Sequence, residues 1–202
     1  MEIVGNASVS TTSTTSPTPV VDGAVGVKSP CWWFISIVNS RHEKKIAEIL
    51  QKLNVEAYVA TQKEIALWAN GRKKTIDRVV IPAKVFVKCS EKKRKELVKL
   101  PFINRFMVNT SARTTSNISP VATVPESEIQ TLKFMLGQTD HPVYFTDTVF
   151  KCQDTVKVIR GKLKGLTGNI INNPDGSHDL IVNLNILGGA SVSIDPSDVE
   201  KI

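Results

Sequence analysis

With 202 residues and a formal charge of +7, the chain can form one large or two small domains with their own hydrophobic cores. The charge is uneven: residues 31–137 carry 19 Lys and Arg against 9 acids, whereas residues 1–30 have a net charge of −1 and residues 138–202 of −2. The sequence contains no apolar run of about 18 residues and no secretory signal, so we exclude a membrane span and expect a cytoplasmic protein. The basic middle block is expected to face nucleic acid or an acidic surface, and the C-terminal block a protein partner.

The first 30 residues include a stretch rich in Ser, Thr and Pro that cannot bury enough apolar surface to offset chain entropy. We therefore expect residues 1–30 to be a disordered tail. A strand is predicted over residues 32–38, which are aromatic and β-branched. Ser40 and Glu43 have the spacing of a capping box, in which Ser40 bonds the Glu43 amide and the Glu43 carboxylate returns to the Ser40 amide. A helix with an apolar stripe should follow, ending near residue 53.

The rest of the middle block predicts strands and helices in alternation. The expected strands are residues 55–60, 65–68, 74–81, 84–88 and 105–109, and the expected helices are residues 90–99 and 125–136. Asn70-Gly71 is a strong two-residue hairpin signal, Ser90 can cap the first of these helices, and Gly137 can end the second. This order predicts an α+β domain over residues 31–137, with helices on one antiparallel sheet.

The C-terminal residues 149–202 predict a small all-β barrel, preceded by a linker at residues 138–148. Val156 and Val158 alternate with polar residues, as in a half-buried strand. The glycines that follow supply positions for positive φ or for the close approach of two backbones. Four or five short strands in about 50 residues suit a closed SH3-like barrel better than an open sheet, which would leave exposed edges.

No motif for catalysis or metal binding is recognisable. The three His and three Cys lie in separate segments, without C-x-x-C, H-E-x-x-H or G-x-S-x-G spacing, and no phosphate-binding loop occurs. We therefore expect a protein that is not an enzyme, has no metal site and no cofactor, and acts by binding alone.

Several segments resemble the NusG family of transcription elongation factors, in which an NGN domain precedes a KOW domain. The matching segments are Trp33-Phe34-Ile35, residues 41–47, Trp68 ahead of Arg72-Lys73-Lys74, residues 81–87, and residues 156–173 with Gly168 on the characteristic KOW glycine. The resemblance covers about residues 31–202 and is closest in pattern to UpxY-type antiterminators, which are tied to polysaccharide operons. The chain departs from the family at Pro82-Ala83-Lys84, where Pro-Gly-Tyr is usual.

This resemblance implies a fold, a partner and a mechanism. The implied domains are an NGN domain at residues 31–137 and a KOW domain at residues 149–202. The NGN sheet would bind the clamp helices of RNA polymerase through an apolar patch and, as a monomer, hold the clamp closed, so that pausing or termination becomes less frequent. The KOW domain would recruit a ribosomal protein or Rho.

The resemblance also implies roles for particular residues. The implied polymerase-binding residues are Trp33, Phe34, Ile81, Pro82 and Phe86. The implied contacts to upstream or non-template DNA, or to the opposite polymerase wall, are Arg41, His42, Lys45, Arg72, Lys73, Lys74, Lys92, Lys93 and Arg94. The implied KOW loop residues are Gly161, Lys164, Gly165 and Gly168.

Three alternatives stay open at this point. The apolar residues can equally be ordinary core, and since Val85 and Phe86 alternate, at most one of the two lies on the patch. The cations of residues 92–95 point around the whole helix and can equally form a solvated face. A ribosome-associated or RNA-binding KOW protein is the alternative function, although an RNA-binding barrel should be basic and residues 138–202 have a net charge of −2.

Overall fold

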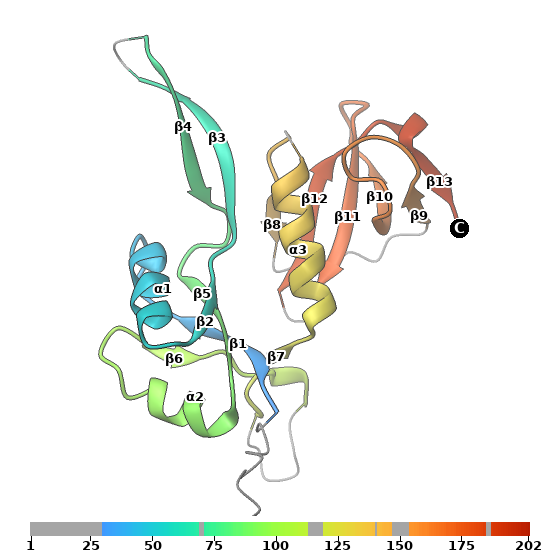
Figure 1. The fold of residues 1–202 in the computed structure, drawn as a ribbon. Helices are drawn as coiled ribbons and strands as arrows, with labels where there is room; N and C mark the ends of the chain where they lie inside the picture. Colours follow the sequence, from blue (N-terminus) through green and yellow to red (C-terminus); the bar gives the residue numbers. More distant parts are fainter. Residues whose placement is uncertain (1–29, 69–70, 113–118, 140, 147–153, 185–186) are drawn as a thin grey trace, which may run out of the picture.

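The computed structural model describes residues 30–68, 71–112, 119–139, 141–146, 154–184 and 187–202 (Figure 1). The predicted tail, apart from Pro30, lies outside these residues, as does Cys152. Of the other two cysteines, Cys31 is exposed, and burial raises the pKa of Cys89 to about 11. No helix in the described part of the chain has the length and apolar character needed to cross a bilayer.

The first sheet has five strands and carries helices on both faces. Its strands are β1 (Trp32–Ile37), β2 (Glu56–Tyr58), β5 (Lys84–Cys89), β6 (Arg105–Phe106) and β7 (Thr123–Val124). The helices are α1 (Glu43–Lys52), α2 (Glu91–Leu97) and α3 (Glu126–Gln138), with a short 3₁₀ helix η1 at Thr110–Ala112. The strand order is β2-β5-β1-β6, and β7 also pairs with β1, all antiparallel.

Alternation along the strands divides the apolar residues between two cores. Phe34, Val85 and Val87 pack on one face with Leu50 of α1 and Leu97 of α2. The other face carries a second group, which packs with α3 and consists of Trp33, Ile35, Phe86, Ile129 and Leu132. The prediction that Val85 and Phe86 point to opposite faces is therefore confirmed.

The predicted capping box at the start of α1 is wrong. The N-cap residue is His42, which makes no side-chain capping bond, and Arg41 has a positive φ of 69°. The Glu43 carboxylate accepts a hydrogen bond from the backbone N–H of Ala83 at 2.7 Å and does not return to the Ser40 amide. The carboxylate thus accepts from a backbone N–H that is 40 residues away along the chain, and not from the nearby Ser40 N–H. The predicted cap of α2 is confirmed, because Ser90 Oγ accepts from the Lys93 amide at 3.3 Å.

Strands β3 (Thr61–Leu67) and β4 (Lys73–Val79) form a separate two-stranded hairpin, here called the arm, which projects from the body of the protein (Figure 1). Gly71 has a φ of +74° in the connecting turn, so the predicted hairpin is confirmed, but the last strand pair is Leu67 with Lys73, and the connection is therefore longer than the predicted two residues. The predicted strand 105–109 shortens to β6, and α3 ends one residue beyond Gly137.

The C-terminal residues form a six-stranded antiparallel sheet with the order β13-β9-β10-β11-β12-β8. Its strands are β8 (Tyr144–Thr146), β9 (Thr155–Val158), β10 (Thr167–Asn172), β11 (His178–Leu184), β12 (Gly188–Ser193) and β13 (Val199–Lys201), with a 3₁₀ helix η2 at Pro196–Asp198. Val156 and Val158 are buried and their neighbours on β9 are exposed, as the alternation predicts.

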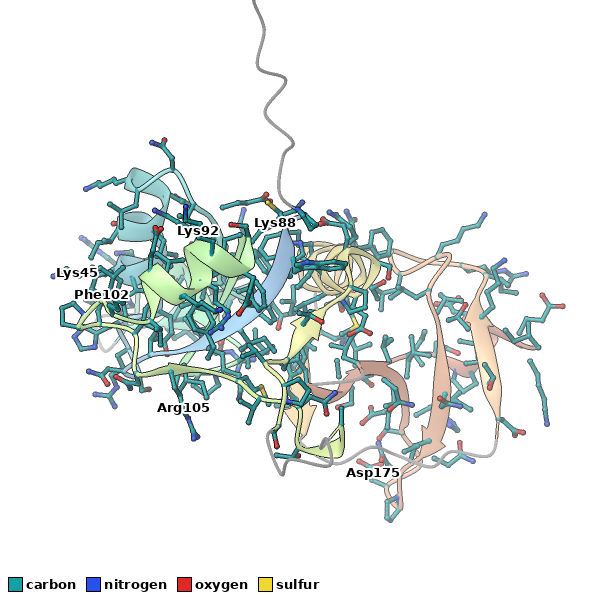
Figure 2. All side chains as sticks on the ribbon, turned by 90° about the horizontal axis from the view of Figure 1, so that it is seen from below. Lys45, Lys88, Lys92, Phe102, Arg105 and Asp175 are labelled. Carbon is teal, nitrogen blue, oxygen red and sulfur yellow. The ribbon has the colours of Figure 1, made fainter. Side chains whose placement is uncertain are left out.

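Helix α3 lies between the first sheet and the C-terminal sheet (Figures 1 and 2). A single apolar cluster runs from Trp33 and Phe86 through Leu132 to Leu180 and Val192. The sequence predicts a linker over residues 138–148, but α3 ends at Gln138 and Tyr144–Thr146 is already a strand. The connection between them is thus short.

Candidate partner-binding surfaces

The predicted polymerase-binding residues do not form an exposed patch in this structure. The exposed fractions are 2% for Trp33, 2% for Phe34, 4% for Ile81 and 0% for Phe86, and Pro82 is the exposed member of the set. Trp33 and Phe34 also lie on opposite faces of the sheet, each covered by helices. The four buried residues therefore support the sheet and cannot contact a partner directly while the fold is intact.

Trp33 is held by a polar cluster at the start of α3. Its indole Nε1 donates to Glu126 Oε2 at 2.7 Å, and Lys88 Nζ donates to the same oxygen at 2.9 Å. Lys88 Nζ and Lys133 Nζ lie 5.6 Å and 5.2 Å from the centre of the Trp33 ring. The hydrogen bonds, with that from Lys88 first, lower the pKa of Glu126 to about 2. This cluster fixes α3 on β1 and β5.

The Glu126 carboxylate should make the fold sensitive to acid. Because its folded-state pKa is lowered from 4.5 to about 2, its contribution to stability is complete above the ordinary pKa and is lost as the pH falls through that interval. In Glu126→Gln, the urea midpoint should therefore fall less steeply between pH 4.5 and 2 than in the wild type. Glu200→Gln, a change outside this cluster, should leave the wild-type profile unchanged. Identical profiles for the wild type and Glu126→Gln would contradict the assignment.

The turn that carries Pro82 is anchored at its next residue. Ala83 donates its N–H to the buried Glu43 carboxylate at 2.7 Å, and its carbonyl accepts from Val38 N at 3.0 Å. Ala83 has a positive φ of 59° although it has a Cβ. Proline at the second position and positive φ at the third are the pattern of a type II turn, which favours glycine at the third. The turn thus has this backbone geometry with alanine, and not glycine, at its third position.

Ala83→Gly should therefore stabilise the fold. Glycine adopts positive φ without the steric penalty, and its greater freedom in the unfolded chain offsets part of that gain. We expect the free energy of unfolding to rise by about 0.5–1 kcal/mol in urea denaturation. Ala57→Gly in β2, where the backbone is extended, is the matched control and should lower it. A loss of stability in Ala83→Gly would show that the Cβ makes a favourable contact.

The cations predicted on α2 mostly have structural partners. The Arg94 guanidinium pairs with Glu91 at 2.5 Å and lies 5.8 Å and 5.5 Å from the ring centres of Phe34 and Phe106. Its side chain is 12% exposed, so little of the guanidinium is open for the predicted nucleic-acid contact, and that contact stays a prediction. Lys93 pairs with Glu96 at 3.2 Å, whereas Lys92 is exposed. The α2 run is therefore closer to a solvated, ion-paired helix face than to a basic patch.

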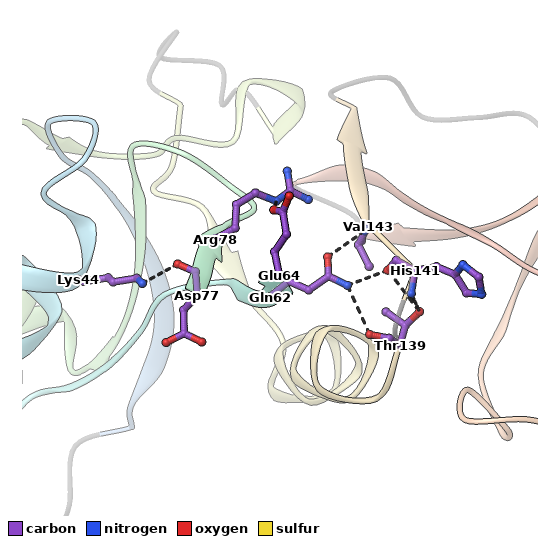
Figure 3. Close-up of polar contacts among 8 residues, drawn as sticks. All are labelled: Lys44, Gln62, Glu64, Asp77, Arg78, Thr139, His141 and Val143. Atoms are coloured by element: carbon purple, nitrogen blue, oxygen red, sulfur yellow. Dashed lines mark hydrogen bonds and ion pairs between the residues drawn. The ribbon is translucent and has the colours of Figure 1, made fainter. Parts of the chain in front are cut away.

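The other predicted cations lie at the start of α1 and on the arm. Arg41, His42 and Lys45 are exposed, and His42 Nδ1 lies 3.1 Å from the Ser40 carbonyl oxygen. Lys44 Nζ donates to the backbone carbonyl of Asp77 on β4 at 2.6 Å, which joins the start of α1 to the base of the arm (Figure 3).

The arm carries the remaining cations at the end farthest from α2. Arg72, Lys73 and Lys74 are all exposed near its tip. Helix α2 lies at the opposite end of the molecule from that tip (Figure 1), while Lys45 and Lys92 both lie on the α1–α2 side of the first sheet (Figure 2). The cations of α1 and α2 therefore lie on the same side of the first sheet, and Lys92 lies far from the tip of the arm.

The glycine-rich loop lies between β9 and β10. Gly161 and Gly165 have φ values of +76° and +97°, and Lys164 is exposed. Gly168 has a different role, because a Cβ at this position would lie 2.5 Å from the carbonyl oxygen of Ile181 on β11. The expectation of positive φ or close backbone approach at these glycines is confirmed.

Sequence reasoning missed Gln62, which links the arm to the connection after α3. Its Nε2 donates to the carbonyl of His141 at 2.7 Å and to that of Thr139 at 3.5 Å, while its Oε1 accepts from Val143 N at 3.0 Å (Figure 3). Gln62 is 4% exposed. Its partners lie 77 to 81 residues away along the chain, so no local pattern marks this contact.

These features define a basic two-sheet binding protein with a projecting arm. The model of one protein family, described as transcription termination factor nusG, matches residues 31–133. The chain therefore belongs to the NusG family, a family of NusG/Spt5-like transcription factors.

The solved structures that are similar to this chain include three of low sequence identity. One, on domain interaction in Thermotoga maritima NusG, is 19% identical, covers 86% of this chain and 98% of its own, and has a TM-score of 0.45. Two conformations of the MjSpt4:Spt5 complex, A and B, are 15% and 16% identical and each covers 84% of this chain; they cover 97% and 96% of their own chains, with TM-scores of 0.28 and 0.30. The search of curated proteins returned no match.

Proposed function

We propose that this chain is a transcription elongation or antitermination factor that binds RNA polymerase through an NGN domain at residues 31–137. The observation that carries the proposal is the NusG family match over residues 31–133. The net charge of this block, with 19 cations against 9 acids, supports a partner rich in phosphates or carboxylates. By preferring the clamp-closed polymerase, such a factor shifts its population toward elongation without any bond chemistry.

The proposed polymerase contact centres on the exposed turn at Pro82. Ile81 next to this turn, and Trp33 and Phe86 farther along the sheet, are buried in the core, so their part in binding is indirect. The hydrogen bond from the Ala83 N–H to Glu43 and the one from the Val38 N–H to the Ala83 carbonyl hold the turn in one conformation, which lowers the entropic cost of binding. Clamp helices of polymerase are the partner that we propose for this turn.

A second role belongs to the C-terminal sheet, which we propose to be a KOW barrel that recruits a ribosomal protein or Rho. Residues 138–202 have a net charge of −2, which suits a protein partner better than RNA. The UpxY-like sequence pattern supports a role in the transcription of a polysaccharide operon. The proposed cellular setting is the cytoplasm, where transcription takes place.

Retention of core RNA polymerase on the full-length tagged chain tests the proposal. The wild type should retain polymerase in moderate salt, and Pro82→Glu should reduce retention at least tenfold. Pro196→Glu, at an exposed proline of η2, is the matched control and should bind like the wild type. Failure of the wild type to retain polymerase, with co-sedimentation with ribosomes instead, would replace this function by the ribosome-associated one. Equal retention by both variants would move the contact away from the turn.

A further inference from the structure

The outer edge of strand β3, which faces away from β4, is an unpaired sheet edge. The Ala60 carbonyl accepts from Val80 N at 2.8 Å and Trp68 N donates to the Arg72 carbonyl at 3.0 Å, so the even-numbered residues of β3 bond with β4. The residues whose N–H and C=O groups point outward are therefore Thr61, Lys63, Ile65 and Leu67. Within the described part of the chain, β3 pairs only with β4. The outer edge can thus accept one more strand.

A groove separates this edge from the end of helix α3. Its volume is about 830 Å³; the arm lines one wall, mainly with residues 61–65, and Leu136 and Gly137 of α3 line the other. Figure 1 shows β3 on the side of the arm that faces α3, and β4 on the side of α1. Gln62 joins the two walls, because its side chain bonds the backbone after α3. A groove beside a free edge is the setting in which an extended segment adds a strand.

Two large apolar side chains lie uncovered along this edge. Ile65 is 66% exposed and Leu67 is 71% exposed. Because side chains alternate along a strand, both lie on the same face of the arm as Lys63, which is also exposed. An edge with exposed apolar side chains is a template for pairing, so proteins usually cover such an edge. A covering strand should place an apolar residue beside Ile65 and an acid beside Lys63.

We propose that residues 18–24 of the N-terminal tail add to β3 as an antiparallel third strand, with Val20 opposite Ile65 and Asp22 opposite Lys63. This register places an apolar side chain beside an apolar one and a carboxylate beside a cation. A strand at these residues replaces the disorder that is expected there from the sequence. Its formation goes beyond the proposed function, because it needs no polymerase.

The prolines of the tail restrict its alignment with β3. The tail residues that donate to β3 in this register, each with a backbone N–H, are Thr18, Val20, Asp22 and Ala24. Pro17 and Pro19 face away from β3, where the missing N–H costs no ladder hydrogen bond. A shift by one residue would turn Pro19 toward β3, remove a hydrogen bond and reverse both side-chain faces. The residue before each proline also favours extended backbone.

The tail has the length and the direction that this strand needs. Its last part leads to Pro30, close to Trp33, which bonds Glu126 at the start of α3. Helix α3 has 13 residues and is about 20 Å long, and its far end lines the groove. The chain from Asp22 to Pro30 spans up to about 27 Å when extended, so it can cover this distance. Since β3 runs from the base of the arm toward its tip, a tail segment that leaves the groove at the base is antiparallel to it.

Hydrogen–deuterium exchange of the full-length chain, followed residue by residue by NMR, tests the added strand at the amides of Lys63 and Ile65. In the wild type these amides should exchange at least about tenfold more slowly than in Val20→Pro, which removes a donor that faces β3. Val21→Pro is the matched control, because its proline faces away from β3, and it should keep the wild-type protection. Equal exchange in the wild type and Val20→Pro, or equal loss of protection in the two proline variants, would overturn the proposal.

Charge variants test the register of the added strand. Asp22→Lys places a cation beside Lys63 and should speed exchange of the Lys63 amide. Glu2→Lys makes the same change at the other acid of the tail, outside the added strand, and should leave the exchange unchanged. Equal exchange in the wild type and Asp22→Lys would overturn the pairing of Asp22 with Lys63.

Other occupants of the edge would give different results. Protection that rises with protein concentration and survives Val20→Pro would assign the edge to a second copy of the chain. Protection that appears only when core RNA polymerase is added would assign it to polymerase. Either result would overturn the proposal. Failure of the wild type to retain polymerase would refute the proposed function and leave the added strand unaffected.

Discussion

Replacing Trp33 by alanine is expected to lower the free energy of unfolding by about 3–5 kcal/mol, a large part of the total stability of an ordinary domain. The substitution removes a side chain that is 2% exposed and leaves a cavity between β1 and α3. It also removes the indole that donates to Glu126 and that lies beneath Lys88 and Lys133. Urea denaturation followed by far-UV circular dichroism measures the loss.

The neighbouring residue provides the control for this prediction. Trp32 is 53% exposed, so Trp32→Ala should change stability by no more than about 0.5 kcal/mol. Similar values for the two variants would show that Trp33 is not part of the core. If the prediction holds, loss of polymerase binding in Trp33→Ala would report unfolding and would not map a contact, which is why the binding test uses Pro82.

Gly168→Ala is the second substitution with a large expected effect, and it should lower the free energy of unfolding by about 1–3 kcal/mol. The added Cβ would lie 2.5 Å from the Ile181 carbonyl oxygen and 3.1 Å from Leu180 Cδ1. Since the first of these atoms is backbone of β11, strands β10 and β11 would have to separate and weaken their ladder. For a chain of this size, the melting temperature should fall by about 2–4 °C per kcal/mol.

Another glycine distinguishes a clash from a general effect of adding a methyl group. A Cβ at Gly137, in the last turn of α3, meets nothing within 4 Å. Gly137→Ala should therefore leave the melting temperature unchanged or slightly raised, because alanine is the better helix former. The prediction would be contradicted if the melting temperature of Gly168→Ala were within about 1 °C of that of the wild type. Strands β10 and β11 would then accommodate the added Cβ without a loss of stability.

Much of the secondary structure follows from local patterns in the sequence. The alternation at residues 84–88, the Ser90 cap and the glycine in the turn of the arm each depend on neighbours a few residues away, and each is confirmed. The capping box at Ser40 and Glu43 is equally local and is wrong. Its carboxylate has a backbone donor 40 residues away, at Ala83, and only the folded chain brings the two together.

In the candidate site, the difference between what local sequence predicts and what distant contacts decide is larger. Alternation indicates that Trp33 and Phe34 face opposite sides of a sheet, but it does not indicate that helices cover both sides. Charge counting identifies Arg94 as one of a run of cations, but not that two rings and Glu91 hold its guanidinium. Exposure depends on what packs against a residue, and sequence periodicity carries no record of that.

The sequence by itself determined most of the strands and helices, the positions that require glycine and the basic charge of residues 31–137, because these properties depend mainly on each residue and its near neighbours. Tertiary structure alone decided which apolar side chains are buried and which cations, such as Arg94, are held by aromatic rings and carboxylates. The bond between Trp33 and Glu126 joins residues 93 positions apart, and such contacts form only when helix α3 packs on the sheet.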